Sequence, residues 1–119
     1  MGYTEVSMEI KERTIEIYEQ VDGKRPYEEW LNDLKDGMSR ARIRARIDKV
    51  ATGNFGDHKP VGDSVSELRF TFGPGFRVYY ALKDETIVLL LIGGDKSSQE
   101  KDIEKAKEFW SDYKERTNE

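Results

Sequence analysis

The side chains best suited to chemistry are Arg69, Arg77 and Tyr79, which lie in two short segments joined by a Gly-Pro-Gly at residues 73–75. Successive residues of a strand point to opposite faces, so these three side chains share one face while their apolar neighbours face a core. Two guanidinium groups there would bind phosphate oxygens, and a tyrosine would stack on a base or donate a hydrogen bond. A structural interpretation stays open, in which Arg69 pairs with Glu67 or a cross-strand acid and Tyr79 only covers the sheet.

A second candidate is the sequence GGDKSS at residues 93–98, between an apolar segment and the last predicted helix. Such a junction exposes backbone N–H groups and a helix N-terminus to an anion, and Lys96 adds a mobile charge. The sequence does not match the phosphate-binding P-loop pattern, so it implies no nucleotide cofactor. A plain strand-to-helix turn with capping serines would explain the same residues.

His58 is the single histidine of the chain and stands beside Lys59 in a predicted loop. It could reach a site as an acid or base, and both residues could contact RNA, although a solvated loop histidine is the commoner case. With one histidine and no cysteine, we expect neither a metal site nor a cofactor.

Four arginines alternate along one predicted helix: Arg40, Arg42, Arg44 and Arg46. On a helix such alternation spreads the side chains over more than one face. They form either a solvated basic surface or a surface that contacts an RNA backbone, with Arg40 and Arg44 as the predicted RNA-binding residues.

Charge is unevenly distributed along the chain. The net charge of −4 argues against a generally basic nucleic-acid-binding protein, but residues 37–80 alone carry a charge of +4. The 119 residues suit a single domain, with residues 1–7 expected to be a flexible leader. The absence of cysteine is compatible with a reducing compartment, and no apolar run is long enough to span a membrane. We therefore expect a cytoplasmic protein.

Hydrophobic periodicity predicts an α+β domain in the order β-α-α-β-β-β-α. The expected elements are a strand within residues 12–19, helices at 26–36 and 39–52, strands at 67–72, 76–82 and 86–92, and a helix after residue 97. Gly37 is expected to end the first helix, Ser39 to cap the second and Glu100 to complete a capping box for the last. Residues 53–65 are expected to be a loop, and the strand at 86–92 an interior strand because it is apolar on both faces. The predicted fold is a mainly antiparallel four-stranded sheet, with an N-terminal helical hairpin and a C-terminal helix covering one face.

Three stretches of the chain resemble a known family: NFGDHKPVGDSVSELR, SELRFTFGPGFRVYY and IVLLLIGGDKSSQEKDIEKAKEFWSDYK. They resemble the phage-derived HigB-like "addiction module killer" branch of the RelE/ParE toxin superfamily, and the similarity runs from about Met8 to the C-terminus. The resemblance implies a RelE/ParE-like fold and a type II toxin, typically a metal-independent endoribonuclease that cuts mRNA in the ribosomal A site. The implied partners are the ribosome with its mRNA and a helix-turn-helix antitoxin encoded next door.

The resemblance also implies roles for residues. Arg77 matches the family's arginine that contacts the scissile phosphate, Arg69 lies near the place of a basic catalytic strand residue, and Lys96 falls near a basic residue that follows the central strand. The 2′-OH would attack the adjacent phosphate and leave a 2′,3′-cyclic phosphate, with Tyr79 positioning the substrate.

Two departures from the family pattern keep other functions open. Asp102 stands where RelE-type members often carry a tyrosine that acts on the 2′-OH, so Tyr79, or His58 with Lys59, would have to substitute. The chain is also acidic, whereas RNA-cleaving members tend to be basic. The alternatives are a ParE-like gyrase inhibitor or other binding module, and a toxin-like scaffold without the chemistry.

Overall fold

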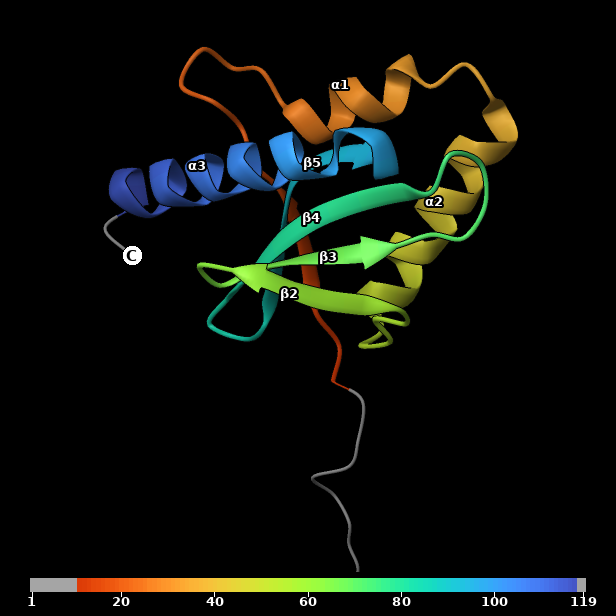
Figure 1. Cartoon of the computed structure of the whole chain (residues 1–119). Helices are drawn as coiled ribbons and strands as arrows, with labels where there is room; N and C mark the ends of the chain where they lie inside the picture. The colour runs from red at the N-terminus through yellow and green to blue at the C-terminus, as the bar shows by residue number, and fades with distance from the viewer. Residues whose placement is uncertain (1–10, 118–119) are drawn as a thin grey trace, which may run out of the picture.

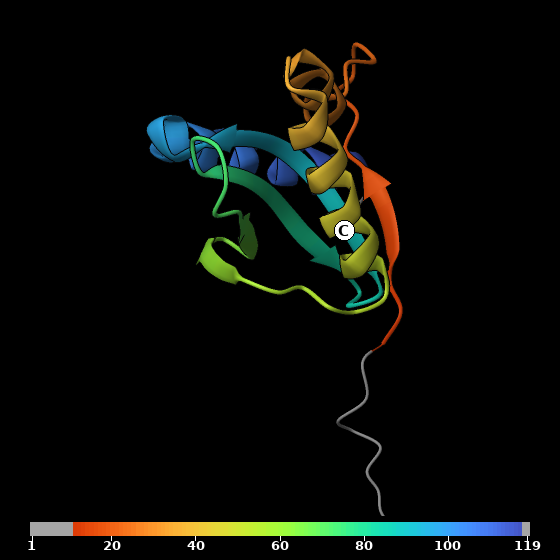
Figure 2. The ribbon, with the colours of Figure 1, turned by 90° about the vertical axis from the view of Figure 1, so that its right-hand side faces the viewer.

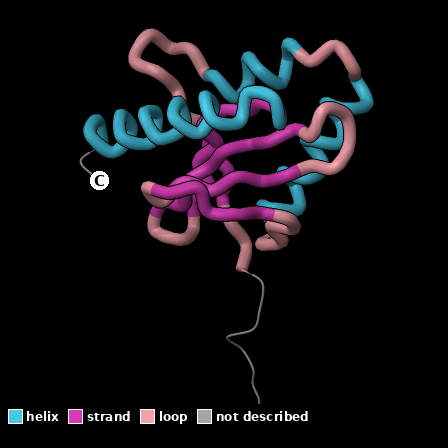
Figure 3. Tube along the Cα trace, in the orientation of Figure 1, coloured by secondary structure: helices cyan, strands magenta, loops and turns pink. Residues whose placement is uncertain are grey.

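The computed structural model describes residues 11–117, which form a five-stranded mixed sheet with helices on both sides (Figure 1, Figure 3). In chain order the elements are β1 (Thr14–Ile17), α1 (Pro26–Asp33), α2 (Gly37–Ala51), β2 (His58–Gly62), β3 (Val65–Arg69), β4 (Phe76–Lys83), β5 (Ile87–Asp95) and α3 (Gln99–Thr117). The α+β class is confirmed. The leader expected at residues 1–7 lies outside the described residues, and no helix within them is long and apolar enough to cross a membrane.

The strands lie in the order β1-β5-β4-β3-β2, with β2 to β5 antiparallel and β1 parallel to β5 at the far edge. The predicted four-stranded sheet is therefore wrong in strand number, because β2 lies where a loop was expected. Its sequence HKPVG lacks apolar alternation, and Pro60 is compatible with a strand because β2 is an edge strand. The prediction that β5 is an interior strand is confirmed.

The connection between β3 and β4 is longer than the tight Gly-Pro-Gly turn that the sequence predicted. β3 ends at Arg69 instead of continuing to residue 72, and residues 70–75 form a loop. The loop closes with a turn in which the Gly75 N–H donates to the Phe72 oxygen (3.2 Å). Phe72 packs edge-on against both Phe70 and Phe76, so this loop is held by an aromatic cluster.

The boundary between the first two helices also differs from the prediction. Gly37 begins α2 instead of ending the preceding helix, and Asp36, not Ser39, is the N-cap. The Asp36 carboxylate accepts from the Met38 N–H (3.2 Å) and from the Ser39 hydroxyl (2.8 Å). These bonds, the Ser39 hydroxyl first, lower the pKa of Asp36. An acid suits this position because it satisfies a backbone donor that has no partner within the helix.

Helices cover both faces of the sheet, whereas the sequence predicted helices on one face only. α1 and α2 cover one face and α3 crosses the other, as the two views show (Figure 1, Figure 2). The core under α1 and α2 includes the predicted α2 stripe and alternate strand residues: Ile43, Ile47, Val50, Leu68, Val78, Tyr80, Val88 and Leu90. The core under α3 includes the intervening strand residues: Val65, Tyr79, Ala81, Leu89 and Leu91. Residues of β5 enter both cores, which explains why that strand is apolar throughout.

The start of α3 is capped differently from the prediction. A single 3-10 turn, Lys96–Ser98, precedes α3, and the capping box is formed by Asp95 and Ser98. Glu100 therefore has no part in the box. This cap fixes the direction in which the chain leaves β5 and crosses the sheet as α3.

Candidate functional site

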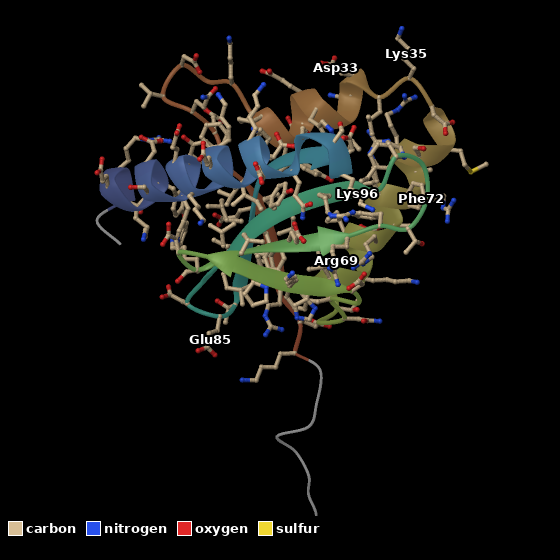
Figure 4. All side chains as sticks on the ribbon, viewed as in Figure 1. Asp33, Lys35, Arg69, Phe72, Glu85 and Lys96 are labelled. Atoms are coloured by element: carbon tan, nitrogen blue, oxygen red, sulfur yellow. The ribbon has the colours of Figure 1, made fainter. Side chains whose placement is uncertain are left out.

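Arg69 and Arg77 lie at one end of the sheet, where β3 ends, β4 begins and β5 ends. Arg69 is the register partner of Arg77, and Arg77 is the partner of Gly94, so both arginine side chains leave the same face of adjacent strands. Figure 4 shows Arg69 at the end of β3, with Lys96 and Phe72 near the same end of the sheet. The prediction that the two arginines are neighbours on one face is confirmed.

Arg77 is held by its own loop and by a buried carboxylate. Its Nη1 donates to the carbonyl oxygens of Gly75 (2.9 Å) and Phe76 (3.1 Å), and its Nε lies 4.0 Å from Glu67 Oε2. The side chain is 11% exposed and its Nε is buried, so the surrounding residues restrict the orientation of the guanidinium. A cation held in this way loses little conformational entropy when it binds an anion.

Glu67 is the buried acid of the site, with 1% of its side chain exposed. Gln99, the first residue of α3, donates from Nε2 to both carboxylate oxygens (3.0 and 3.2 Å). Sequence reasoning treated Glu67 only as a possible partner of Arg69 and missed Gln99. Strand alternation places Glu67 on the same face as both arginines, and this is the signal by which Glu67 could have been found. No local feature of the sequence around Gln99 indicates that it lies above Glu67.

Tyr79 also lies on this face, but α3 covers it and its side chain is fully buried, at 0% exposure. The expectation that it stacks on a base or positions substrate on an open face is therefore wrong. Burial raises the pKa of its phenol above the usual 10.0, and the carboxylates of Glu67 and Asp102 raise it further. Tyr79 remains protonated at neutral pH and supports the site through packing.

Arg69 forms an exposed ion pair with Asp57, the residue before β2. Its Nη2 lies 3.0 Å and its Nε 3.3 Å from Asp57 Oδ1, and the two side chains are 36% and 51% exposed. The interpretation that Arg69 pairs with an acidic residue is therefore correct, although its partner is Asp57 and not Glu67. An exposed pair contributes about 0–1 kcal/mol. A phosphate can compete with Asp57 for this guanidinium.

Lys96 is exposed and flanks Arg77 across Gly75. A Cβ added to Gly75 would lie 3.4 Å from Lys96 Cβ and 3.5 Å from Arg77 Nη1. The helix N-terminus beside Lys96 is not open to an anion as predicted, because Asp95 Oδ1 accepts from the N–H (2.8 Å) and hydroxyl (2.5 Å) of Ser97. These bonds, the hydroxyl first, lower the pKa of Asp95. The ammonium of Lys96, not the backbone, is the group available to a phosphate.

Asp102 is turned into the protein and packs over the end of β5. It is 9% exposed and accepts from the Ser98 hydroxyl (2.5 Å), and a Cβ on Gly94 would overlap its carboxylate. Burial raises the pKa of Asp102, while the Ser98 hydroxyl lowers it. The Asp102 carboxylate therefore lies over Gly94, the register partner of Arg77, and is engaged by Ser98.

His58 and Lys59 point to opposite faces of the sheet. His58 is the register partner of Leu68, on the α2 side, and Lys59 is the partner of Glu67, on the side of the arginines. His58 Nδ1 lies 2.8 Å from the Gly56 oxygen. The structure therefore separates the proposed acid–base pair and leaves only Lys59 on the face of the site.

Arg40 and Arg44, the arginines predicted to bind RNA, do not join this site. Arg40 donates from Nη1 to the Leu34 oxygen in the α1–α2 connection, and Arg44 lines a groove with Glu28 and Asp48. Neither lines the groove beside Arg69. Among residues 11–117, no group of three or more His, Asp or Glu side chains is placed to hold a metal ion.

The fold and this geometry define a class: a small α+β protein with two guanidinium groups and an ammonium at one end of a mixed sheet, an arrangement suited to phosphate. Residues 29–111 match the family model described as "Phage derived protein Gp49-like (DUF891)", a span that includes Arg69, Arg77 and Lys96. The chain belongs to this Gp49-like family. A relative from Haemophilus influenzae, described as "Uncharacterized protein", is 48% identical over 81 residues, covering 68% of this chain and 82% of the relative.

Proposed function

We propose that this protein is the toxin of a toxin–antitoxin pair and that it cleaves mRNA on the ribosome without a metal ion. The Gp49-like family is associated with RelE-like toxins of such systems, which supports the toxin role. The observation that carries the nuclease role is the pairing of Arg69 with Arg77 in direct register beside Lys96. Three cations around one point can bind a phosphodiester and stabilise the charge that develops during its cleavage.

In the proposed reaction the 2′-oxygen of one nucleotide attacks the adjacent phosphorus and the bond from phosphorus to the 5′-oxygen breaks. The 2′-OH gives up its proton and the leaving 5′-oxygen takes one up, so the products are a 2′,3′-cyclic phosphate and a free 5′-OH. Arg77 binds a non-bridging oxygen because its guanidinium is already oriented by Gly75, Phe76 and Glu67. Arg69 exchanges Asp57 for a second oxygen, and Lys96 offsets the added negative charge.

The experiment is expression without the antitoxin, followed by growth measurement and mapping of mRNA 5′ ends. We expect the wild type to arrest growth and to generate new 5′ ends only on translated mRNA. Arg77→Ala, tested alone and together with Glu67→Gln to avoid an uncompensated buried acid, should restore growth and abolish the cuts. Arg44→Ala is the matched control, because it removes an arginine outside the site, and it should remain toxic.

Three outcomes would contradict the proposal. Equal toxicity and identical cuts with Arg77→Ala would exclude the role of Arg77. Growth arrest with intact mRNA and a DNA-damage response would indicate gyrase as the target. Normal growth with a folded wild-type protein would indicate a scaffold without the chemistry, an alternative favoured by the burial of Asp102 at the position where RelE-type members carry tyrosine.

A further inference from the structure

A second cationic surface lies beside Arg69, in a groove of about 440 Å³ between α2 and residues 69–72. We call it the α2 groove and define it by four cations and one acid: Arg42, Arg46, Lys49, Arg69 and Asp57. Its rim includes Phe72, the labelled aromatic residue near Arg69 in Figure 4. The groove therefore combines an excess of positive charge with an aromatic side chain at its border.

Three of the four cations of the α2 groove come from one side of α2. Arg42, Arg46 and Lys49 are spaced by four and three residues, which places them one above another on a helix. Arg44 lies outside this row and lines a different groove with Glu28 and Asp48. Arg42 and Arg46 thus line a cationic groove, whereas Arg44 lines a groove of mixed charge. The alternating sequence pattern did not reveal this difference.

Two of these cations form no ion pair and no side-chain hydrogen bond with the described residues, whereas Arg46 does. Arg46 is structural, because it donates to the backbone oxygens of Phe55, Asp57 and Arg69 (2.8, 2.8 and 2.9 Å). Arg42 and Lys49 are exposed and, within residues 11–117, have no ion pair and no side-chain hydrogen bond. The guanidinium carbon of Arg42 lies 3.9 Å above the centre of the Phe72 ring. That stack presents a flat cationic surface at the mouth of the groove.

We propose that the α2 groove binds single-stranded RNA next to the phosphate held by Arg77, with backbone phosphates on Lys49 and Arg42 and a base on the Arg42–Phe72 stack. The proposal rests on the proposed function for the identity of the strand. Phosphates bind readily to cations that have no anionic partner, and bases stack on flat aromatic or guanidinium surfaces; the groove offers both. Arg69 lines the groove and is the register partner of Arg77, so a strand that passes around this end of the sheet, from the α2 face to the α3 face, would contact both sites.

The test is fluorescence anisotropy with the full chain and a labelled single-stranded RNA of about 12 nucleotides carrying 2′-O-methyl groups, which remove the attacking hydroxyl. Arg42→Gln with Lys49→Gln should weaken binding at least tenfold. It should also reduce the slope of log affinity against log salt by about 1.4, at about 0.7 for each lost phosphate contact. Arg44→Gln, on the other side of the same helix, should bind as the wild type does.

The possible results distinguish a failure of this proposal from a failure of the proposed nuclease function. If the double variant binds RNA as tightly as the wild type, or if the wild type binds no RNA, the α2 groove is not an RNA site. If the groove variants lose affinity for a labelled acidic peptide but bind RNA as the wild type does, the groove is a protein-binding surface and the proposal is overturned. If the wild type binds RNA through the groove but leaves mRNA uncut in cells, the nuclease proposal fails and the groove proposal stands.

Discussion

Glu67 is a carboxylate almost completely removed from water, and this is unusual in a strand so close to the end of a sheet. Its charge is balanced by Arg77 and by two hydrogen bonds from Gln99. Removing one partner of a buried pair leaves the other charge uncompensated, which costs more than the pair contributes. We infer that Glu67 is a positioning residue whose purpose is to fix the orientation of Arg77.

Glu67→Ala should lower the free energy of unfolding by about 3 kcal/mol, because it leaves Arg77 without its carboxylate. Glu67→Gln keeps the volume and an acceptor for Gln99, so it should stay folded but lower the cleavage rate more than the affinity for RNA. Urea denaturation measures the first effect and single-turnover cleavage the second. Glu100→Gln, an exposed acid on the first turn of α3, is the control. Unchanged cleavage by Glu67→Gln would refute the positioning role.

Asp102 should make stability depend on pH in an identifiable direction. Burial raises its pKa in the folded protein above the 3.8 of the unfolded chain, so the folded state binds the proton more tightly. The resulting stabilisation is fully present below pH 3.8 and is lost as the pH rises through the raised value. The free energy of unfolding of the wild type, minus that of Asp102→Asn, should therefore fall with rising pH across that window. Urea denaturation at several pH values checks this, and a difference that grows with pH would contradict it.

At the scale of elements, the two glycines near the end of β5 allow helices to pack on both sides of the strand. A Cβ on Gly93 would overlap the Trp30 ring of α1, and one on Gly94 would overlap the Asp102 carboxylate of α3. Neighbouring residues of a strand face opposite ways, so the pair makes room for one bulky side chain on each face. The glycines therefore set how closely α1 and α3 approach the strand that ends at the candidate site.

Gly93→Ala should lower the free energy of unfolding by about 1–3 kcal/mol, because the added methyl forces Trp30 away from β5. Gly37→Ala is the matched control, since its Cβ would meet only Arg40 Nη2 at 3.4 Å at the start of a helix. It should change stability by less than about 1 kcal/mol and in the stabilising direction. Thermal or urea denaturation of the two variants gives the comparison. A Gly93→Ala protein as stable as the wild type would show that Trp30 can repack without cost.

The sequence predicted those elements whose signals are local. Alternation in β3 and β4 placed Arg69 beside Arg77, and the apolar β5 indicated an interior strand. The same double-sided apolar pattern in β5 also indicates that both faces of the sheet are covered, which is why Tyr79 is buried. β2 was missed because Pro60 and flanking polar residues resemble a loop, and its pairing with β3 is a tertiary feature. Contacts across the chain, such as Gln99 to Glu67, leave no periodic trace.

At the scale of the whole molecule, α3 connects the candidate site to the opposite edge of the sheet. Its first residue, Gln99, holds Glu67, while its last turns reach the end of β1. There Asp112 accepts from the Tyr18 hydroxyl (2.6 Å) and pairs with Arg116 (2.8 Å). Burial, with the hydrogen bond to Asp112 next, raises the pKa of Tyr18 to about 12, so the hydroxyl is a donor at every working pH. Tyr18 and Asp112 thus fasten the far end of the helix that covers Tyr79.

Tyr18→Phe should weaken this attachment while leaving the ring in the core under α3. Loss of the hydrogen bond to Asp112 should lower the free energy of unfolding by about 1 kcal/mol. Hydrogen exchange should accelerate most in the last turns of α3, because that end opens locally before the whole molecule unfolds. Tyr27→Phe is the control, since Tyr27 is also a largely buried tyrosine but its hydroxyl makes no hydrogen bond to another described residue. If exchange instead rises equally over α3 and the sheet, the helix and sheet open as one unit, and access to Tyr79 and Glu67 requires unfolding of the whole molecule.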